Sequence, residues 1–217
     1  MPRTLKNVKA SANPRGRPGT SSTVDVRATI LEVAERLFAE RGYTATPVRD
    51  IADAAGFTPA MVHYYFGNKE TLLQAVLEQA LEPLARVIEK MKSADAVAPE
   101  DIVRRLMTIV SKHPNLPYLV VREVMLPGGT MQAHFARHLA PRLGGALPGL
   151  LERERREGRI RDDMPPAIAA MAIMALALFP FIVRPVAEQA LGLRLSGKAL
   201  LDFEDHISAF VKRGLTP

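Results

Sequence analysis

Two short segments, each opened by a Thr-Pro pair and closed by a glycine, constrain this chain more than any other feature. Thr46-Pro47 precedes the first segment, which ends at Gly56, and Thr58-Pro59 precedes the second, which ends at Gly67. A threonine hydroxyl can accept a backbone N–H at a helix start, proline suits the first helical position, and glycine permits the turn that ends a helix. The spacing therefore predicts two short helices joined by a tight turn, which is the arrangement of a helix-turn-helix.

Apolar residues recur with helical spacing along the rest of the chain. One helix face is outlined by Ile30, Ala34, Leu37 and Phe38. The same period continues over 69–92, where Asn68 is placed to cap the helix and Pro83 is expected to kink it. Further helical segments are expected within 102–110, 119–126, 130–157, 165–183 and 198–211. Because no segment shows the alternation of a strand, the sequence predicts an all-α fold.

Charge separates the first residues from the rest. The formal net charge is +6, and residues 1–23 contribute five basic residues and no acidic one. This segment is rich in Pro, Gly, Ser and Thr and has few large apolar side chains, so we expect a flexible basic arm. A basic arm on a nearly neutral body indicates a polyanionic partner, either nucleic acid or a membrane surface.

The second short helix has the composition of a recognition helix. It begins with small residues and continues with aromatic and hydrogen-bonding ones. In a helix-turn-helix, the start of the second helix faces base edges in the major groove, and small side chains there allow a deep fit. Hydroxyls, imidazoles and helix N-termini can bind phosphate oxygens. For Tyr64 and Phe66, a place in the core of a three-helix unit is the competing interpretation.

The run over 56–72 reads Gly-Phe-Thr-Pro-Ala-Met-Val-His-Tyr-Tyr-Phe-Gly-Asn-Lys-Glu-Thr-Leu. It resembles the TetR family of bacterial transcriptional regulators, whose pattern is Gly-Val-Ser-x-x-x-Leu-Tyr-x-Tyr/His-Phe-x-x-Lys-x-x-Leu. The upstream run from Ala34 to Gly56 is also similar to that family, so the resemblance covers residues 25–75. The chain departs from the pattern at His63, where the family usually has a tyrosine that donates to phosphate. Phe57 and Val62 are conservative departures at core positions.

The resemblance implies an N-terminal three-helix helix-turn-helix DNA-binding domain over 24–70, joined to a larger helical effector-binding and dimerisation domain over 71–217. It further implies a homodimeric regulator, expected to be a repressor, that binds a palindromic operator and is released by a small apolar effector. Its last two helices would pair with those of a second subunit, which would explain why 167–183 is apolar all round. The candidate DNA contacts are Arg49, Thr58, Pro59, Ala60, Met61, His63, Tyr64, Tyr65 and Lys69. For Arg49 a solvated charge is the alternative.

The arm adds a second candidate contact. The run Pro-Arg-Gly-Arg-Pro over 14–18 resembles the core of an AT-hook, in which Arg15 and Arg17 would lie in a narrow minor groove. The alternative is a solvated basic tail. In both cases the arm should add salt-dependent affinity for DNA.

Methionine and aromatic residues in the second half of the chain predict an apolar ligand cavity between helices, with ordinary core positions as the alternative. The candidate lining residues are Met107, Tyr118, Met125, Phe135, Met171, Met174 and Phe179.

Two other functions remain open on the sequence. His134 and His138 have the i, i+4 spacing of a metal pair, as in a small metal-binding protein or enzyme, but no third ligand lies at motif distance. With no Cys and no nucleophile-elbow motif, we expect no enzyme, cofactor or metal. The segment 167–183 could anchor a membrane protein, but it is short, rich in Ala and interrupted by Pro180. We expect a buried helix, no signal sequence, no membrane partner and a cytoplasmic protein.

Overall fold

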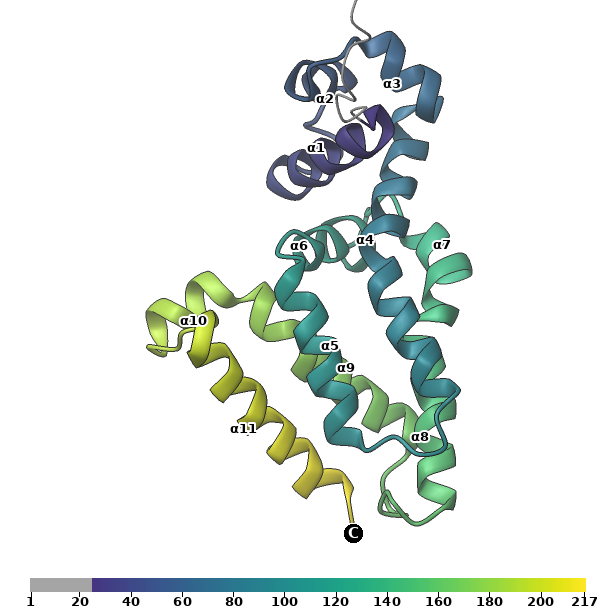
Figure 1. Ribbon diagram of the computed structural model, residues 1–217, viewed down its shortest axis with the longest axis vertical. Coiled ribbons are helices and arrows are strands. Elements are labelled where there is room, and N and C mark those ends of the chain that lie inside the picture. The colour runs from purple at the N-terminus through teal and green to yellow at the C-terminus, as the bar shows by residue number, and fades with distance from the viewer. Residues whose placement is uncertain (1–24) are drawn as a thin grey trace, which may run out of the picture.

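The computed structural model describes residues 25–217, and it is helical, with no strand in that range. The expected all-α fold is therefore confirmed. Figure 1 shows α1, α2 and α3 grouped at one end, with a larger helical body at the other end and α4 running from one part into the other. The candidate minor-groove residues Arg15 and Arg17 lie outside the described residues.

The small end of the molecule is a three-helix unit built from α1 (Val26–Arg41), α2 (Val48–Ala55) and α3 (Pro59–Phe66). Phe38, Ile51 and Val62 are buried at its centre, one from each helix. Thr58 caps α3 as expected, because its hydroxyl accepts the Met61 N–H at 3.4 Å. Gly56 has a φ of +76°, which supplies the left-handed turn between α2 and α3.

The cap expected at Thr46 is wrong. Thr46 is fully buried, and its hydroxyl donates to the carbonyl oxygen of Gly42 at 2.8 Å, with the carbonyl of Leu37 3.3 Å away. Pro47 occupies the cap position of α2 and offers no side-chain hydrogen bond. The Thr46 hydroxyl is thus bonded at the C-terminal end of α1, at the cap residue Gly42, and makes no cap hydrogen bond at the start of α2.

The first helix of the body is α4 (Lys69–Lys92), which continues through Pro83 as a single helix. Asn68 caps it as expected, accepting the Thr71 N–H at 2.9 Å. The expected domain boundary at residue 70 falls in the first turn of this helix. The remaining elements are α5 (Pro99–Lys112), α6 (Leu116–Val120), the π-helical turn η1 (Val121–Met125), α7 (Gln132–His134), the π-helical turn η2 (Phe135–Leu139), the 3₁₀ turns η3 (Ala140–Arg142) and η4 (Gly144–Ala146), α8 (Leu147–Arg156), α9 (Pro166–Ile182), α10 (Arg184–Ala190) and α11 (Gly197–Leu215).

The body is organised around α5, which packs against both α9 and α11, while α8 packs against α9. Figure 1 shows α9 and α11 on either side of α5. The apolar helix α9 is only half covered: Ala169, Ile173 and Ala177 are buried, whereas Met171 and Phe179 are exposed. No single helix among residues 25–217 is long and apolar enough to cross a membrane; α9 and α10 meet that length only as a pair bent by 76°.

Candidate nucleic-acid interface and apolar cavity

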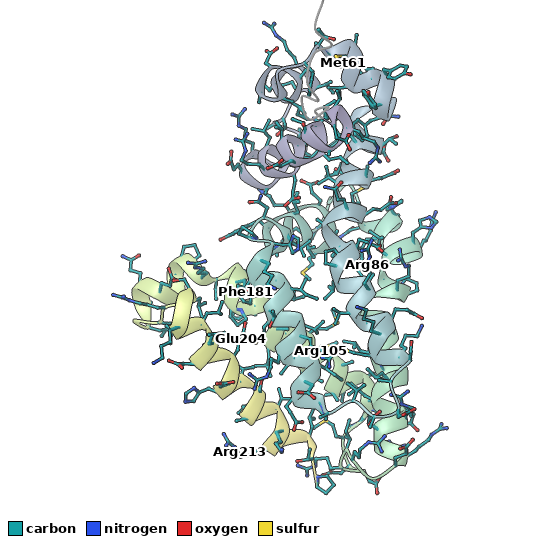
Figure 2. All side chains as sticks on the ribbon, in the orientation of Figure 1. Met61, Arg86, Arg105, Phe181, Glu204 and Arg213 are labelled. Carbon is teal, nitrogen blue, oxygen red and sulfur yellow. The ribbon has the colours of Figure 1, made fainter. Side chains whose placement is uncertain are left out.

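One side of α3 is open to solvent at the end of the molecule away from the body, where Figure 2 shows Met61. Val62 and Phe66 face inward and are buried, and Met61 is half-buried. The exposed residues are Thr58, Pro59, Ala60, His63, Tyr64 and Tyr65. The core interpretation is confirmed for Phe66 and wrong for Tyr64, whose residue is 84% exposed.

The side chain of His63 is engaged within its own helix end. Its Nδ1 lies 2.9 Å from the carbonyl oxygen of Gly67, the residue that ends α3. Because a carbonyl only accepts, Nδ1 carries the proton in this contact. A neutral His63 therefore presents Nε2 to solvent as an acceptor, and only the imidazolium form could donate to a phosphate through it. A tyrosine, which is usual at this position in the family that the sequence resembles, can donate its hydroxyl proton to a phosphate without first becoming charged.

Arg49 lies in the first turn of α2. Its side chain is 83% exposed and pairs loosely with Asp53 one turn later, at 3.6 Å. An exposed pair of this kind contributes little to stability, so the guanidinium remains available to an incoming ligand. The unit as a whole is not basic, since residues 25–70 carry five Arg or Lys and seven Asp or Glu. Any affinity of this unit for DNA must therefore come from a few placed groups and helix N-termini rather than from net charge.

Lys69, at the start of α4, is half-buried. Its ammonium nitrogen lies 4.2 Å from the centre of the Tyr43 ring. Burial lowers the pKa of Lys69, and the carboxylate of Glu123 opposes that shift. Burial also raises the pKa of Tyr43, as do the nearby carboxylates of Glu70 and Glu123. The candidate phosphate contact is thus part of a cluster that joins the three-helix unit to the body.

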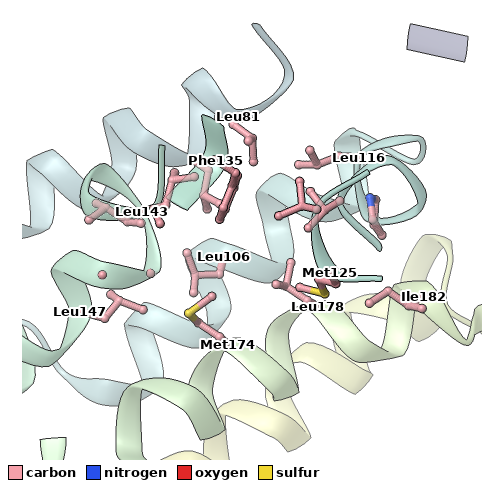
Figure 3. Close-up of a pocket in the computed structure, with 18 residues that line it drawn as sticks. Leu81, Leu106, Leu116, Met125, Phe135, Leu143, Leu147, Met174, Leu178 and Ile182 are labelled. Atoms are coloured by element: carbon pink, nitrogen blue, oxygen red, sulfur yellow. The ribbon is translucent and has the colours of Figure 1, made fainter. Parts of the chain in front are cut away.

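The body contains an apolar cavity with a volume of about 340 Å³. Figure 3 shows side chains from several helices directed into it, among them Leu81, Leu106, Phe135 and Met174. Every residue that lines it, within the described part of the chain, is apolar or glycine. The full lining is Leu81, Leu84, Ile88, Leu106, Leu116, Pro117, Val120, Val124, Met125, Phe135, Ala140, Leu143, Gly144, Gly145, Leu147, Met174, Leu178 and Ile182. Such a surface favours an uncharged apolar molecule, because a buried charge would have no partner there.

The structure distributes the candidate cavity residues over four places. Met125, Phe135 and Met174 line the cavity. Met107 is fully buried in the core, and Tyr118 borders a separate open hollow. Met171 and Phe179 are 73% and 59% exposed on the outer side of α9.

The histidine pair expected from the sequence is present. The ring centres of His134 and His138 are 4.9 Å apart, and His134 Nε2 lies 3.3 Å from a carboxylate oxygen of Glu78. No group of three or more His, Asp or Glu side chains within residues 25–217 is arranged to hold a metal ion. This pair therefore gives no support to the alternative of a metal-binding protein or enzyme.

Comparison with known proteins agrees with these features. Residues 30–76 match the model of the bacterial regulatory proteins of the tetR family, and residues 96–211 match a tetracyclin repressor-like C-terminal domain. The HTH-type transcriptional repressor NicS of Pseudomonas putida is 28% identical over 195 residues, which cover 87% of this chain and 92% of NicS.

Two solved structures share the fold. The ketosteroid transcriptional regulator KstR2 of Mycobacterium tuberculosis has a TM-score of 0.64 at 21% identity, covering 88% of this chain and 95% of that one. AibR, solved in complex with isovaleryl coenzyme A and operator DNA, has a TM-score of 0.63 at 21% identity, with 89% and 99% coverage. Because the two family models together span both parts of the structure, this chain belongs to the TetR family of bacterial transcriptional regulators.

Proposed function

We propose that this protein is a homodimeric transcriptional repressor that binds a palindromic operator through α3 and leaves it when a small, uncharged apolar molecule fills the cavity. The observation that carries the proposal is the pairing of two features in one chain. One is the open α3 surface with small residues at its start, and the other is the apolar lining of the cavity. NicS is a transcriptional repressor, and AibR was solved with both isovaleryl coenzyme A and operator DNA, which supports a repressor that binds DNA and a ligand. Coenzyme A carries charged phosphates, so the uncharged character of the effector rests on the cavity lining of this chain alone.

Dimerisation is supported by the outer surface of the last helices. Seven of the twelve exposed large hydrophobic residues in the described chain lie between positions 168 and 210. They are Ile168, Met171, Phe179, Val186, Leu191, Leu201 and Phe210. Exposed apolar side chains gathered on neighbouring helices are typical of an interface. An isologous pairing through α9 and α11 would cover it and place two α3 helices on one side of the dimer.

Contacts within the groove follow from the positions of the exposed residues. Thr58, Pro59 and Ala60 add little bulk, so the start of α3 can approach base edges closely. Arg49 is placed to bind a guanine edge or a phosphate, and Tyr64 and Tyr65 carry hydroxyls toward the flanking backbone. Two such surfaces, about 34 Å apart in a dimer, would read two half-sites one helical turn apart.

Selection of bound duplexes from a random pool, followed by footprinting, tests the proposal. We expect one palindromic sequence to be enriched and protected, and we expect Arg49→Ala to weaken binding to it by about 1–3 kcal/mol. Binding of the same variant to an unrelated duplex should change much less, because base contacts and not phosphate contacts carry specificity. Failure to enrich any sequence, with a folded protein at low salt, would refute the DNA-binding role.

A further inference from the structure

The segment Leu116–Met125, formed by α6 and η1, separates the cavity from the three-helix unit. Val120, Val124 and Met125 line the cavity on one side of this segment. On its other side, Tyr118, Val121 and Arg122 border an open hollow of about 530 Å³, together with Ala39 and Glu40 of α1. Figure 1 shows α6 beneath α1 and beside α5. A single helical segment thus contacts the ligand site and the DNA-binding unit.

Arg122 binds the C-terminal end of α1. Its Nη1 donates to the carbonyl oxygens of Ala39 at 3.0 Å and Glu40 at 2.9 Å. These carbonyls belong to the last turn of α1, which carries the negative end of the helix dipole, so a guanidinium is well placed there. Gly42 follows this last turn with a φ of +84°, a backbone conformation that disfavours any larger residue, and a Cβ there would make only ordinary van der Waals contact with Arg122, at 3.7 Å from Cζ.

Glu123 binds the connection that follows α1. This carboxylate is buried, and its Oε1 accepts the backbone N–H of Tyr43 at 3.0 Å. The Lys69 ammonium lies over the ring of the same Tyr43. Two consecutive residues of η1 therefore hold the end of α1, the α1–α2 connection and, through Tyr43, the start of α4.

The backbone of η1 departs from the regular α-helix. Leu126 N–H donates to the carbonyl of Val121 at 3.0 Å, five residues back, which makes this a π-helical turn. Such turns are less stable than α-helix and occur often at functional sites. A change to α-helical pairing would rotate the residues after it by about 100° around the helix axis, since one turn contains 3.6 residues. The open hollow beside Arg122 leaves room for such a change.

We infer that Arg122 and Glu123 are positioning residues that fix the orientation of the three-helix unit, and that a ligand in the cavity acts on them by displacing Val124 and Met125 on the same turn. The ligand-dependent half of this inference rests on the proposed function. The helix α4 already runs from the body into the three-helix unit. Under this inference, η1 provides a second connection between the cavity and α1–α3.

Hydrogen exchange of the full-length protein tests the first half without DNA. The readout is a peptide that covers residues 39–46 and contains the Tyr43 amide. We expect Arg122→Ala and Glu123→Leu to speed its exchange about tenfold or more, because each removes a partner of this segment. Arg122→Lys and Glu123→Gln keep a donor and an acceptor and should retain much of the protection. Arg105→Ala, at an exposed position of α5, is the matched control.

The second half is tested with N-phenyl-1-naphthylamine, a neutral apolar fluorophore small enough for the cavity. We expect it to bind wild type and both removal variants alike, to speed exchange of the 39–46 peptide in wild type, and to weaken wild-type DNA binding about fivefold or more. In Arg122→Ala and Glu123→Leu the probe should change DNA affinity less than about twofold, because the coupling passes through the deleted contacts.

The possible failures are distinguishable. If the probe does not bind wild type, the proposed effector cavity is refuted, and the exchange of the variants without probe still tests the positioning role. If Arg122→Ala and Glu123→Leu leave exchange of the 39–46 peptide at the wild-type rate, the positioning role is overturned. If they bind DNA and respond to the probe as wild type does, the coupling through η1 is overturned while the proposed function stands.

Discussion

The ammonium nitrogen of Lys69 lies 4.2 Å above the Tyr43 ring, so a residue expected to bind phosphate is also part of the joint between the DNA-binding unit and the body. A partly buried cation–π contact of this kind is worth about 0.5–2 kcal/mol. The two roles can be separated, because only one of them involves DNA.

We expect Lys69→Ala to weaken DNA binding to a similar extent on all sequences and to reduce the slope of log affinity against log salt concentration by about 1, as for the loss of one phosphate contact. Tyr43→Leu should lower the free energy of unfolding by about 1 kcal/mol and leave the salt slope unchanged. Fluorescence anisotropy at several salt concentrations measures the salt slopes, and urea unfolding measures the stability. A Lys69→Ala effect confined to the selected operator would contradict the phosphate assignment.

The basic arm should supply most of the salt dependence, because residues 25–70 carry more acidic than basic side chains. Deletion of residues 1–23 removes five positive charges, so we expect the salt slope to fall by about 4 to 5. Replacing Arg15 and Arg17 by Ala should cost more affinity on A·T-rich duplexes than replacing Lys6 and Lys9, which removes the same charge. Equal losses for the two pairs on every duplex would identify the arm as a solvated tail.

Gly144 controls the volume of the cavity. A Cβ at this position would clash with the sulfur of Met174, so the Met174 side chain would have to move within the cavity lining. We expect Gly144→Ala to weaken binding of N-phenyl-1-naphthylamine by about fivefold to tenfold, which corresponds to about 1–1.4 kcal/mol. Gly149→Ala is the matched control, since nothing lies within 4 Å of its Cβ. Unchanged fluorescence titrations for Gly144→Ala would place the probe outside this cavity.

Glu154 links stability to pH. Its carboxylate is completely buried and pairs with Arg153 and Arg159. Burial alone would raise the pKa of Glu154, but hydrogen bonds from Arg159 and Arg153 outweigh it and hold the pKa below the ordinary value. A lowered carboxylate pKa contributes stability above the unfolded-state pKa, and this contribution is lost as the pH falls through the folded-state pKa.

Glu154→Gln should therefore lower the free energy of unfolding at pH 7 by about 2 kcal/mol. This loss is smaller than the loss for a fully buried ion pair, because the side chains of Arg153 and Arg159 are both about one-third exposed to solvent. The difference from wild type should shrink below the ordinary glutamate pKa. Urea unfolding at fixed protein concentration measures it, with Glu89→Gln, in an exposed ion pair, as control. A gap that is equally large in acid would show that packing, and not charge, is responsible.

The sequence predicted the parts of this fold that depend on local chemistry. The caps at Thr58 and Asn68 and the turn at Gly56 follow from side-chain and backbone preferences, and all three are present. The role of Thr46 was not predicted, because its hydroxyl can bond either forward to the start of α2 or back to the carbonyl of Gly42, and it bonds back. The short helix α10 was missed because seven residues containing a proline carry little periodic signal.

The candidate site also contains residues that the local sequence predicts and others whose positions depend on tertiary packing. The exposed start of α3 follows from its motif, whereas the exposure of Tyr64 depends on how α3 packs on α2 and α4. Met171 and Met174 are alike in the sequence, and only the position of α9 against α5 places one outside and the other in the cavity. The contacts of Arg122 and Glu123 join positions about 80 residues apart, which no local pattern could indicate.

The most direct test of the central claim is the affinity of Ala60→Glu for the selected operator. Ala60 lies exposed at the start of α3, where a glutamate would bring both bulk and negative charge against the DNA. We predict at least a tenfold loss, about 1.4 kcal/mol, with no change in folding, while Ala136→Glu on the exposed surface of the body binds like wild type. Wild-type affinity for Ala60→Glu would show that α3 does not enter the groove.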